Sequence, residues 1–236
     1  AMPALAVGTS SPGSLRGART AVAGALEDLM VGAGNWLAPA LRQRLAAGFG
    51  NHGVLTAPMA ELLGLSEIIG TRIWSEAEQE VMAYVPDTDY PDTALSAPLM
   101  TVARAIKLDL GTRVATVDVP GWDTHVGQAG QFAGLTDGLS NSLMAFWRDL
   151  GALQQDVSVV VMSEFGRRLR SNTGGGTDHG RGNVMMVLGP QARGGRMLGR
   201  WPGLANDALD EGADLAVTTD YRAVLTEMLN GHMGLA

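Results

Sequence analysis

Carboxylate and imidazole side chains gather in short polar clusters in the second half of the sequence. Asp123 and His125 stand two residues apart, and Asp178 and His179 are adjacent within the glycine-rich stretch 174–180. Neutral imidazole nitrogens and carboxylate oxygens together suit Zn, Mn or Fe. A divalent metal held here would activate water and polarise a phosphoryl or sulfuryl oxygen. The sequence therefore predicts a metal site, although a turn cap by Asp123 and a backbone hydrogen bond from His125 are the alternative roles.

A third cluster adds an acid and several guanidinium groups. Glu164 follows the apolar run 157–162 directly and is followed by Arg167, and Arg181 comes shortly after the glycine-rich stretch. A carboxylate in this place suits a metal ligand or a general base, and arginine suits bidentate binding of an oxyanion. A structural ion pair between Glu164 and an arginine is the competing interpretation.

Charge is distributed unevenly along the chain. The net charge of −7 argues against general nucleic-acid binding. From Ser163 to Arg200, however, there are seven arginines and only two acidic residues. Such a basic stretch in an acidic protein indicates a small anionic partner, whereas a solvated loop is the alternative. The absence of cysteine excludes disulfides and thiolate metal sites.

The elements that must position these clusters alternate along the chain. Apolar runs near Leu5 and over 113–119, 157–162 and 183–188 predict buried strands. Helical spacing of apolar residues predicts helices from Thr20 and over 35–47, 57–63, 75–84, 94–107, 128–150 and 220–229. We therefore expect an α/β fold, with a mostly parallel sheet covered by helices on both faces. Such sheets bind ligands at the carboxyl ends of their strands, where the polar clusters fall.

The remaining sequence signals are weaker. No apolar run approaches the roughly 20 residues of a membrane span, and the opening residues lack the pattern of a signal peptide. His52 lies in a turn-like stretch and is a further candidate, whereas we expect no role for His232.

At these residues the sequence resembles the bacterial domain-of-unknown-function family 1501. The resemblance is most specific from Arg113 to Leu204 and rests on the stretches 121–125, 162–167, 176–182 and 201–204. The family is grouped with the alkaline phosphatase and sulfatase superfamily and is usually exported. The resemblance thus implies a single alkaline-phosphatase-like α/β domain over 1–236, in a periplasmic or extracellular location. It also implies an incomplete N-terminus, because a Gly-Gly-Asn-Asp-Gly-type motif of the family is missing.

The same resemblance implies roles for individual residues. Asp123 and His125 look like a pair that ligates one metal, and His179 looks like a later histidine ligand. Asp178 then compensates for a ligand that is lost because Phe165 stands where the superfamily has a histidine. Glu164 would be a ligand or base.

Two functions follow from these roles. The first is metal-dependent hydrolysis of phosphate or sulfate esters, with Arg167 and Arg181 as anion clamps. The second is a degenerate, non-catalytic relative that binds an anionic ligand or a protein partner. The departure at Phe165 and the missing motif motivate the second function.

Overall fold

The computed structural model describes residues 2–32, 38–50, 53–190, 192 and 194–234. The chain divides into two compact units. The first comprises Ala1–Val119 and Gly138–Leu150, and the second comprises Pro120–Asp137 and Gly151–Ala236. The long helix α4 (Gln128–Leu150) contributes to both units.

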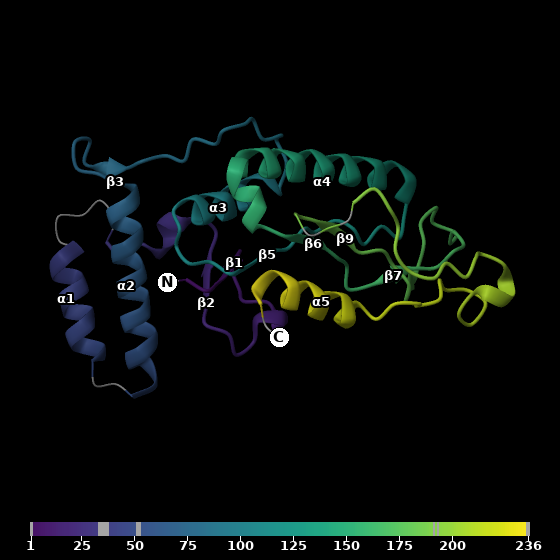
Figure 1. Ribbon diagram of the computed structural model, residues 1–236, viewed down its shortest axis with the longest axis horizontal. Helices are drawn as coiled ribbons and strands as arrows, with labels where there is room; N and C mark the ends of the chain where they lie inside the picture. The colour runs from purple at the N-terminus through teal and green to yellow at the C-terminus, as the bar shows by residue number, and fades with distance from the viewer. Residues whose placement is uncertain (1, 33–37, 51–52, 191, 193, 235–236) are drawn as a thin grey trace. The chain divides into compact units, whose positions relative to one another are not determined.

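A parallel sheet forms the centre of the first unit (Figure 1). Its strands are β1 (Ala4–Val7), β2 (Thr20–Ala23) and β5 (Val114–Val117), in the order β2-β1-β5. β1 pairs in parallel with both neighbours, which explains its continuous apolar sequence, since a central strand is covered on both faces. The predicted α/β class and the strands near Leu5 and 113–119 are confirmed.

The first unit also contains the helices α1 (Ala38–Phe49), α2 (Thr56–Ile73) and α3 (Ser96–Lys107). Of these, α2 and α3 contribute residues to the core. Leu5 of β1 packs with Leu26, Ile69 and Ile73 in one fully buried cluster. The helix predicted over 94–107 is confirmed, whereas the one predicted over 57–63 extends ten residues further, to Ile73.

Two predicted helices of the first unit are wrong. The segment from Thr20 forms strand β2 and then a 3-10 helix over Leu26–Leu29, because Thr20 and Val22 are β-branched and pair with β1. The segment 75–84 contains the short strands β3 (Trp74–Ser75) and β4 (Glu80–Val81). Gln79 has a φ of 56° there, which turns the chain back and is incompatible with a continuing helix.

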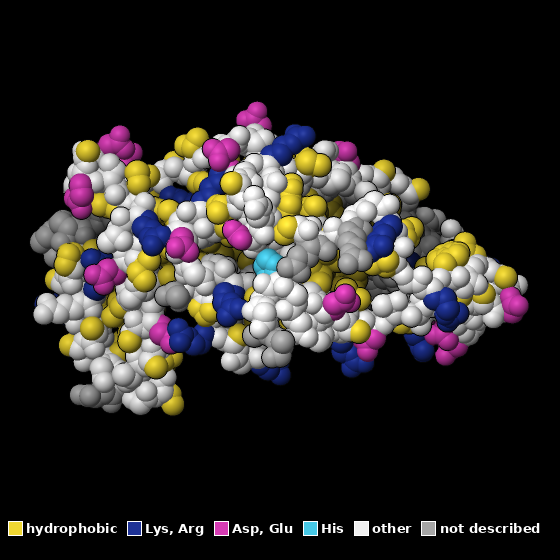
Figure 2. Space-filling model, in the orientation of Figure 1, with side chains coloured by type: hydrophobic (Ala, Val, Ile, Leu, Met, Phe, Trp, Pro, Cys, Tyr) yellow, Lys and Arg dark blue, Asp and Glu magenta, His cyan; other side chains and the backbone are white. Residues whose placement is uncertain are grey.

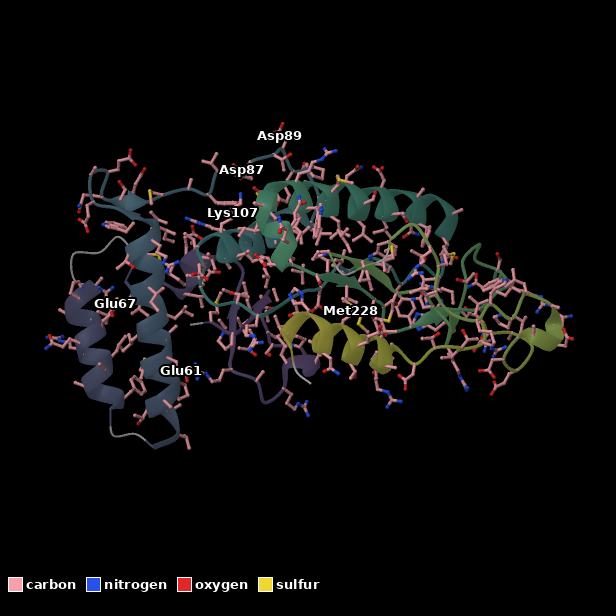
Figure 3. The ribbon with its side chains drawn as sticks, in the orientation of Figure 1. Glu61, Glu67, Asp87, Asp89, Lys107 and Met228 are labelled. Atoms are coloured by element: carbon pink, nitrogen blue, oxygen red, sulfur yellow. The ribbon has the colours of Figure 1, made fainter. Side chains whose placement is uncertain are left out.

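A buried carboxylate fixes the extended segment that leads into α3. Asp149 has no exposed surface, and its two oxygens accept hydrogen bonds from four donors. These are Tyr84 Oη (2.7 Å), Tyr90 Oη (2.9 Å), Lys107 Nζ (2.6 Å) and the backbone NH of Asp87 (2.8 Å). Figure 3 shows Lys107 at the end of α3, beside the segment that carries Asp87.

The same network shifts the pKa values of its members. Burial opposes the charge of Asp149, but the Lys107 ammonium and the other donors outweigh it and lower the pKa of the carboxyl. Burial, reinforced by the hydrogen bond to Asp149, raises the pKa of the Tyr84 hydroxyl to about 12. Asp149 therefore stays ionised and both tyrosines stay neutral at ordinary pH.

The second unit contains two small antiparallel pairs. β6 (Val159–Val161) pairs with β9 (Met186–Leu188), and β7 (Gly166–Arg167) pairs with β8 (His179–Gly180). The runs 157–162 and 183–188 are thus strands as predicted, but they are not parallel. A parallel connection requires a crossover, usually a helix, whereas the described residues 162–185 contain only the β7–β8 hairpin.

Two helices belong wholly or partly to the second unit. α5 (Tyr221–Met233) begins as predicted, because the Asp220 side chain caps it by accepting from the NH of Arg222. α4 has the predicted range, but only its later half is deeply buried, and Phe132 on the predicted apolar face is half exposed.

The structure also bears on the predicted basic stretch and on the question of a membrane-spanning helix. Figure 2 shows acidic and basic side chains interspersed on the drawn face, without an extended single-sign patch among the described residues. Among the described residues, one helix, Gly53–Ile73, is long and apolar enough to cross a membrane, with a mean hydropathy of 1.3. Only 11% of the most apolar part of this helix is buried. Core helices of soluble proteins and signal sequences can have the same length and apolar composition.

Candidate metal centre

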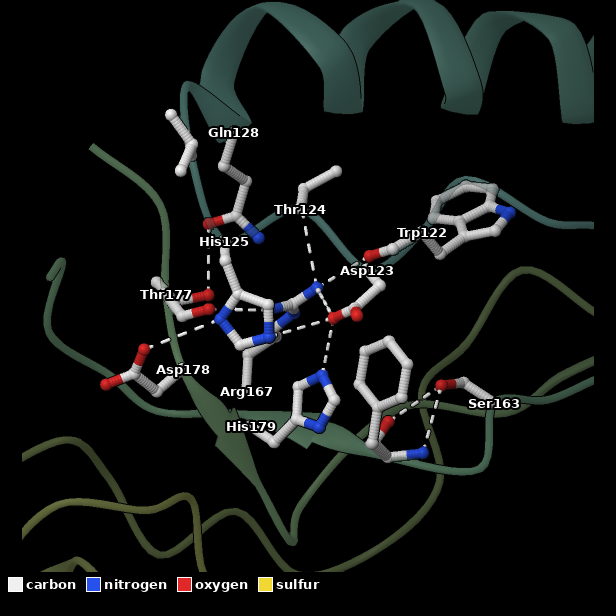
Figure 4. Close-up of polar contacts among 12 residues, drawn as sticks. Trp122, Asp123, Thr124, His125, Gln128, Ser163, Arg167, Thr177, Asp178 and His179 are labelled. Carbon is white, nitrogen blue, oxygen red and sulfur yellow. Dashed lines mark hydrogen bonds and ion pairs between the residues drawn. The ribbon is translucent and has the colours of Figure 1, made fainter. Parts of the chain in front are cut away.

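Three predicted ligands converge in the second unit (Figure 4). Asp123 Oδ1 lies 2.6 Å from His179 Nε2 and 2.9 Å from His125 Nε2. The three ligand atoms all lie within 4.8 Å of one another. The two imidazole rings are tilted by 33°, with centroids 4.7 Å apart. The structure thus brings Asp123, His125 and His179 into one space, whereas Glu164, which was predicted to belong to the same site, is not part of this group.

Separate elements bring these side chains together. Asp123 and His125 lie on the irregular segment that follows β5 in the chain. His179 begins β8, where it pairs with Arg167 of β7. The ring of Phe165 stacks on the His179 ring at 4.1 Å, with an interplanar angle of 9°. Phe165 therefore provides a flat wall for the candidate ligand His179, at a place where the superfamily resemblance suggests a lost ligand.

Asp178 lies behind His125. Its Oδ1 is 3.5 Å from His125 Nδ1, while His125 Nε2 faces Asp123. A carboxylate at the far nitrogen of a ligand histidine fixes the tautomer and the orientation of the ring. The predicted ligand Asp178 is therefore placed to orient His125, outside the group of three atoms that face one another.

Asn172 connects the two histidine loops and was not among the predicted site residues. Its Nδ2 donates to the carbonyl of His125 (3.0 Å) and to Asp178 Oδ1 (3.0 Å). Its Oδ1 accepts from the backbone NH groups of Gly174 (2.9 Å) and Gly176 (3.2 Å). An asparagine just before a glycine-rich turn is a recognisable signal for this kind of local bonding.

The glycine-rich stretch is required by close packing. A Cβ at Gly176 would lie 2.2 Å from the carbonyl oxygen of His125, a distance that no side chain tolerates. A Cβ at Gly166 would lie 2.1 Å from the carbonyl oxygen of Gly182. These glycines therefore allow the backbones that carry the ligands to approach one another.

Arg167 is largely enclosed in this unit. It donates to the carbonyls of Trp122 (2.6 Å) and Thr177 (2.5 Å), and 19% of its side chain is exposed. Its guanidinium also lies 4.8 Å from the Phe165 ring centroid and 3.7 Å from Asp123 Oδ1. The carbonyl contacts use donors that the predicted anion clamp would need, so Arg167 is placed mainly to tie the ligand loops together.

Two other predicted catalytic residues lie apart from the ligand group. Glu164 is exposed, and among the described residues it makes no hydrogen bond or ion pair with Asp123, His125 or His179. Arg181 forms ion pairs with Asp210 (3.2 Å) and Glu211 (3.6 Å). Arg181 is therefore paired with the acidic residues of a loop about 30 positions later in the sequence. The spacing of residues along the sequence did not predict this contact.

The sequence contains two further histidines, His52 and His232. His52 lies outside the described residues. His232, for which no role was expected, has its Nδ1 3.2 Å from Ser158 Oγ and so connects α5 to the residue before β6.

The electrostatics of the group favour ionised carboxylates. The hydrogen bond with His179 lowers the pKa of Asp123, and the charges of His125 and Arg167 act in the same direction. The hydrogen bond from Asn172, with a smaller contribution from His125, lowers the pKa of Asp178. Both carboxyls are therefore anionic at neutral pH, as metal coordination and imidazole orientation require.

Two imidazole nitrogens and one carboxylate oxygen form a familiar kind of donor set. Three protein ligands leave a fourth position of a tetrahedral metal open for water or substrate. The group is also accessible, since the side chains of Asp123, His125 and His179 are each about half exposed. The residues present therefore fit a divalent ion with an open position.

Comparison with known proteins gives a family but no named activity. The profile of the family described as "Protein of unknown function (DUF1501)" matches residues 69–236, a range that contains the whole ligand group. No curated protein and no solved structure matches the chain. The match covers well over half of the sequence and agrees with the motifs around Asp123 and His179. The chain therefore belongs to the DUF1501 family.

Proposed function

We propose that this protein is a metal-dependent hydrolase of phosphate or sulfate esters. The observation that carries the proposal is the convergence of Asp123, His125 and His179, whose ligand atoms lie within 4.8 Å of one another in an exposed site. A bound Zn, Mn or Fe ion would supply an activated water and a Lewis acid for the ester oxygen. The second unit also contains the whole basic stretch, Ser163 to Arg200, that suits an anionic substrate.

The residues of the chain have distinct tasks in this proposal. Asp123 offers an ionised oxygen between two imidazoles. Asp178 lies 3.5 Å from His125 Nδ1 and would hold a proton there, so that His125 Nε2 would be available to hold the ion. Arg167 and Phe165 keep the loops of Asp123 and His179 in register, so that the ligands need little reorganisation when the ion binds.

Some finer assignments also belong to the proposal. Glu164 stays a proposed ligand or general base on the sequence resemblance alone, because no hydrogen bond or ion pair among the described residues joins it to Asp123, His125 or His179. Arg181 has less support as an anion clamp, since Asp210 and Glu211 engage it. Kinship with alkaline phosphatases and sulfatases, and export from the cytoplasm, rest on the sequence resemblance alone. Cell fractionation tests export separately.

Metal binding and turnover are tested in sequence. The protein is dialysed against chelator, titrated with Zn²⁺ or Mn²⁺, and followed by thermal unfolding and elemental analysis, since a ligand that binds only the folded state raises its stability. Aryl phosphates and aryl sulfates are then assayed with the loaded protein. We expect His179→Ala to abolish both metal uptake and turnover, whereas the matched control His232→Ala retains both.

A second candidate function is binding of an anionic ligand or partner without catalysis. Two points favour it: the superfamily resemblance implies a histidine where Phe165 stands, and the donors of Arg167 point at backbone carbonyls. The two functions differ in a single result. A protein that binds the metal stoichiometrically, yet hydrolyses neither class of ester, would support the non-catalytic function.

A further inference from the structure

A polar pocket lies in the same unit as the ligand group. It has a volume of about 200 Å³ and is lined by Arg168, Arg170, Ser171, Asn172, Asp178 and Ala213. Asn172 and Asp178 belong both to this pocket and to the support of His125. The pocket is therefore next to the proposed metal centre but consists of different functional groups.

The two arginines of the pocket differ in their partners. Arg170 donates to the carbonyl of Gly212 (3.2 Å) and to the side-chain oxygen of Asn206, both of which are neutral acceptors. Among the described residues, no carboxylate forms an ion pair with Arg170, so its guanidinium has no direct charged partner. Arg168 forms an ion pair through its Nε with Asp214 Oδ1 at 3.3 Å, and within the described part of the chain its two terminal nitrogens form no hydrogen bond or ion pair.

Backbone hydrogen bonds hold the walls of the pocket. The NH of Arg168 donates to the carbonyl of Asp178 (3.0 Å), and the NH of Leu169 donates to the carbonyl of Ala213 (3.1 Å). Asp214 is itself largely buried and forms an isolated bridge with Arg168. The guanidinium groups therefore project from a fixed frame, which reduces the entropy lost when they bind a ligand.

We propose that this pocket binds an oxyanion group, a sulfate, phosphate or carboxylate, through Arg170 and the free terminal nitrogens of Arg168. Guanidinium groups recognise such anions by paired, charge-assisted hydrogen bonds. This inference rests on the proposed function for its biological meaning: the substrate carries a second, non-reacting anionic group in addition to the ester that meets the metal. The substrate class is then a doubly charged ester, such as a multiply sulfated or phosphorylated molecule.

The charge balance predicts coupling to the metal. Two carboxylates, Asp178 and Asp214, stand against the two arginines, so the pocket is close to neutral when no ion is bound. Asp178 also faces His125, and a divalent ion at His125 Nε2 would offset its charge. We therefore expect anions to bind more tightly to the metal-loaded protein than to the chelated protein.

Calorimetric titration of the whole chain with inorganic sulfate and phosphate tests the pocket directly. Arg170→Gln should weaken sulfate binding by roughly ten-fold or more, as expected from the loss of a charge-assisted hydrogen-bonding group worth about 1.5–3 kcal/mol. Arg170→Lys keeps the charge and should retain part of the affinity. The matched control Arg200→Gln removes another exposed arginine of the basic stretch and should change nothing.

Two outcomes would overturn the proposal. One is the absence of saturable binding by the metal-loaded wild type, and the other is an equal loss of affinity in Arg170→Gln and Arg200→Gln. Circular dichroism establishes that the variants are folded, and Arg170 is exposed, which favours tolerance of the change.

A further measurement separates this proposal from the function on which it rests. Metal uptake should be unchanged in Arg170→Gln and lost in His179→Ala. If neither ester class is turned over but sulfate binding depends on Arg170, the hydrolase proposal fails and the pocket stands. If 4-nitrophenyl sulfate and an analogue with an added ring sulfonate are hydrolysed with equal kcat/KM, and Arg170→Gln does not change that ratio, the pocket is not a substrate subsite.

Discussion

Two aspartates, one in each unit, bring distant segments together in opposite ways. Asp149 is fully buried, and two tyrosines, a lysine and a backbone NH saturate its oxygens. Asp123 has a side chain that is 62% exposed, and one of its oxygens is shared by two imidazoles. The first carboxylate cannot accept a new partner without losing an old one, whereas the second can. A closed network of this kind stabilises a fold, and an open one is suited to a ligand.

The largest expected effect comes from removing Asp149, the centre of the closed network. Asp149→Ala leaves the ammonium of Lys107 and two tyrosine hydroxyls without their main acceptor. We expect a loss of about 3–5 kcal/mol in the free energy of unfolding, the usual cost of breaking a buried pair. Urea denaturation measures it. Asp87→Asn removes an exposed partner of the same lysine and should cost less than about 1 kcal/mol. A comparable small loss in both variants would mean that Asp149 is not the centre of the network.

At the exposed group around Asp123 we expect the reverse: a large loss of metal affinity and a small loss of stability. His179→Ala should lower metal affinity by roughly a hundred-fold or more, because it removes one of three ligands. Its effect on the stability of the metal-free protein should be small, since the ring is about half exposed. Metal titration and thermal unfolding of the same variant give both numbers. A severe loss of stability with metal affinity intact would place His179 among structural residues.

A variant of Asp178 distinguishes a residue that orients a metal ligand from one that coordinates the metal itself. Asp178→Asn preserves the shape of the side chain but removes the charge behind His125 Nδ1. We expect metal affinity to fall by about 10–100-fold without loss of stoichiometry, as for other partners of ligand histidines. Isothermal calorimetry measures affinity and stoichiometry together. Complete loss of the ion would instead support the role of direct ligand that the sequence suggested.

The smallest predicted effect is a dependence of stability on pH. The folded state lowers the pKa of Asp149, so its contribution is present above the ordinary aspartate pKa and is lost as pH falls through the folded value. Below about pH 4, wild-type stability should therefore decrease with acidification by at most about 1.4 kcal/mol per pH unit from this group. Asp149→Asn should lack that component. Parallel acid profiles of the two proteins would contradict the assignment.

The sequence predicted the long elements and the residues of the candidate metal site better than the residues that surround and support them. α4 is a long amphipathic helix, so its periodicity defined its range, and the Asp123, His125 and His179 clusters stood out in a chain with four histidines. The hairpin that carries His179 was not predictable in this way, because two-residue strands have no period to detect.

The roles of the supporting residues depend on tertiary contacts. Arg167 binds backbone carbonyls far away in the chain, and Phe165 stacks on His179, so neither role leaves a trace in local spacing. Asn172 did leave a local trace, the turn signal before Gly174, but its bond to the carbonyl of His125 links residues 47 positions apart. The antiparallel pairing of β6 and β9 likewise follows from the connection between them, not from their apolar sequences.

The central claim is that Asp123, His125 and His179 form a metal centre. Its most direct test is calorimetric titration of the chelated protein with Zn²⁺ and Mn²⁺, with elemental analysis of the dialysed product. We predict one tightly bound ion per chain in the wild type and in His232→Ala, and none in His179→Ala. A wild-type protein that takes up no ion, or a His179→Ala variant that binds it with unchanged affinity, would contradict the claim.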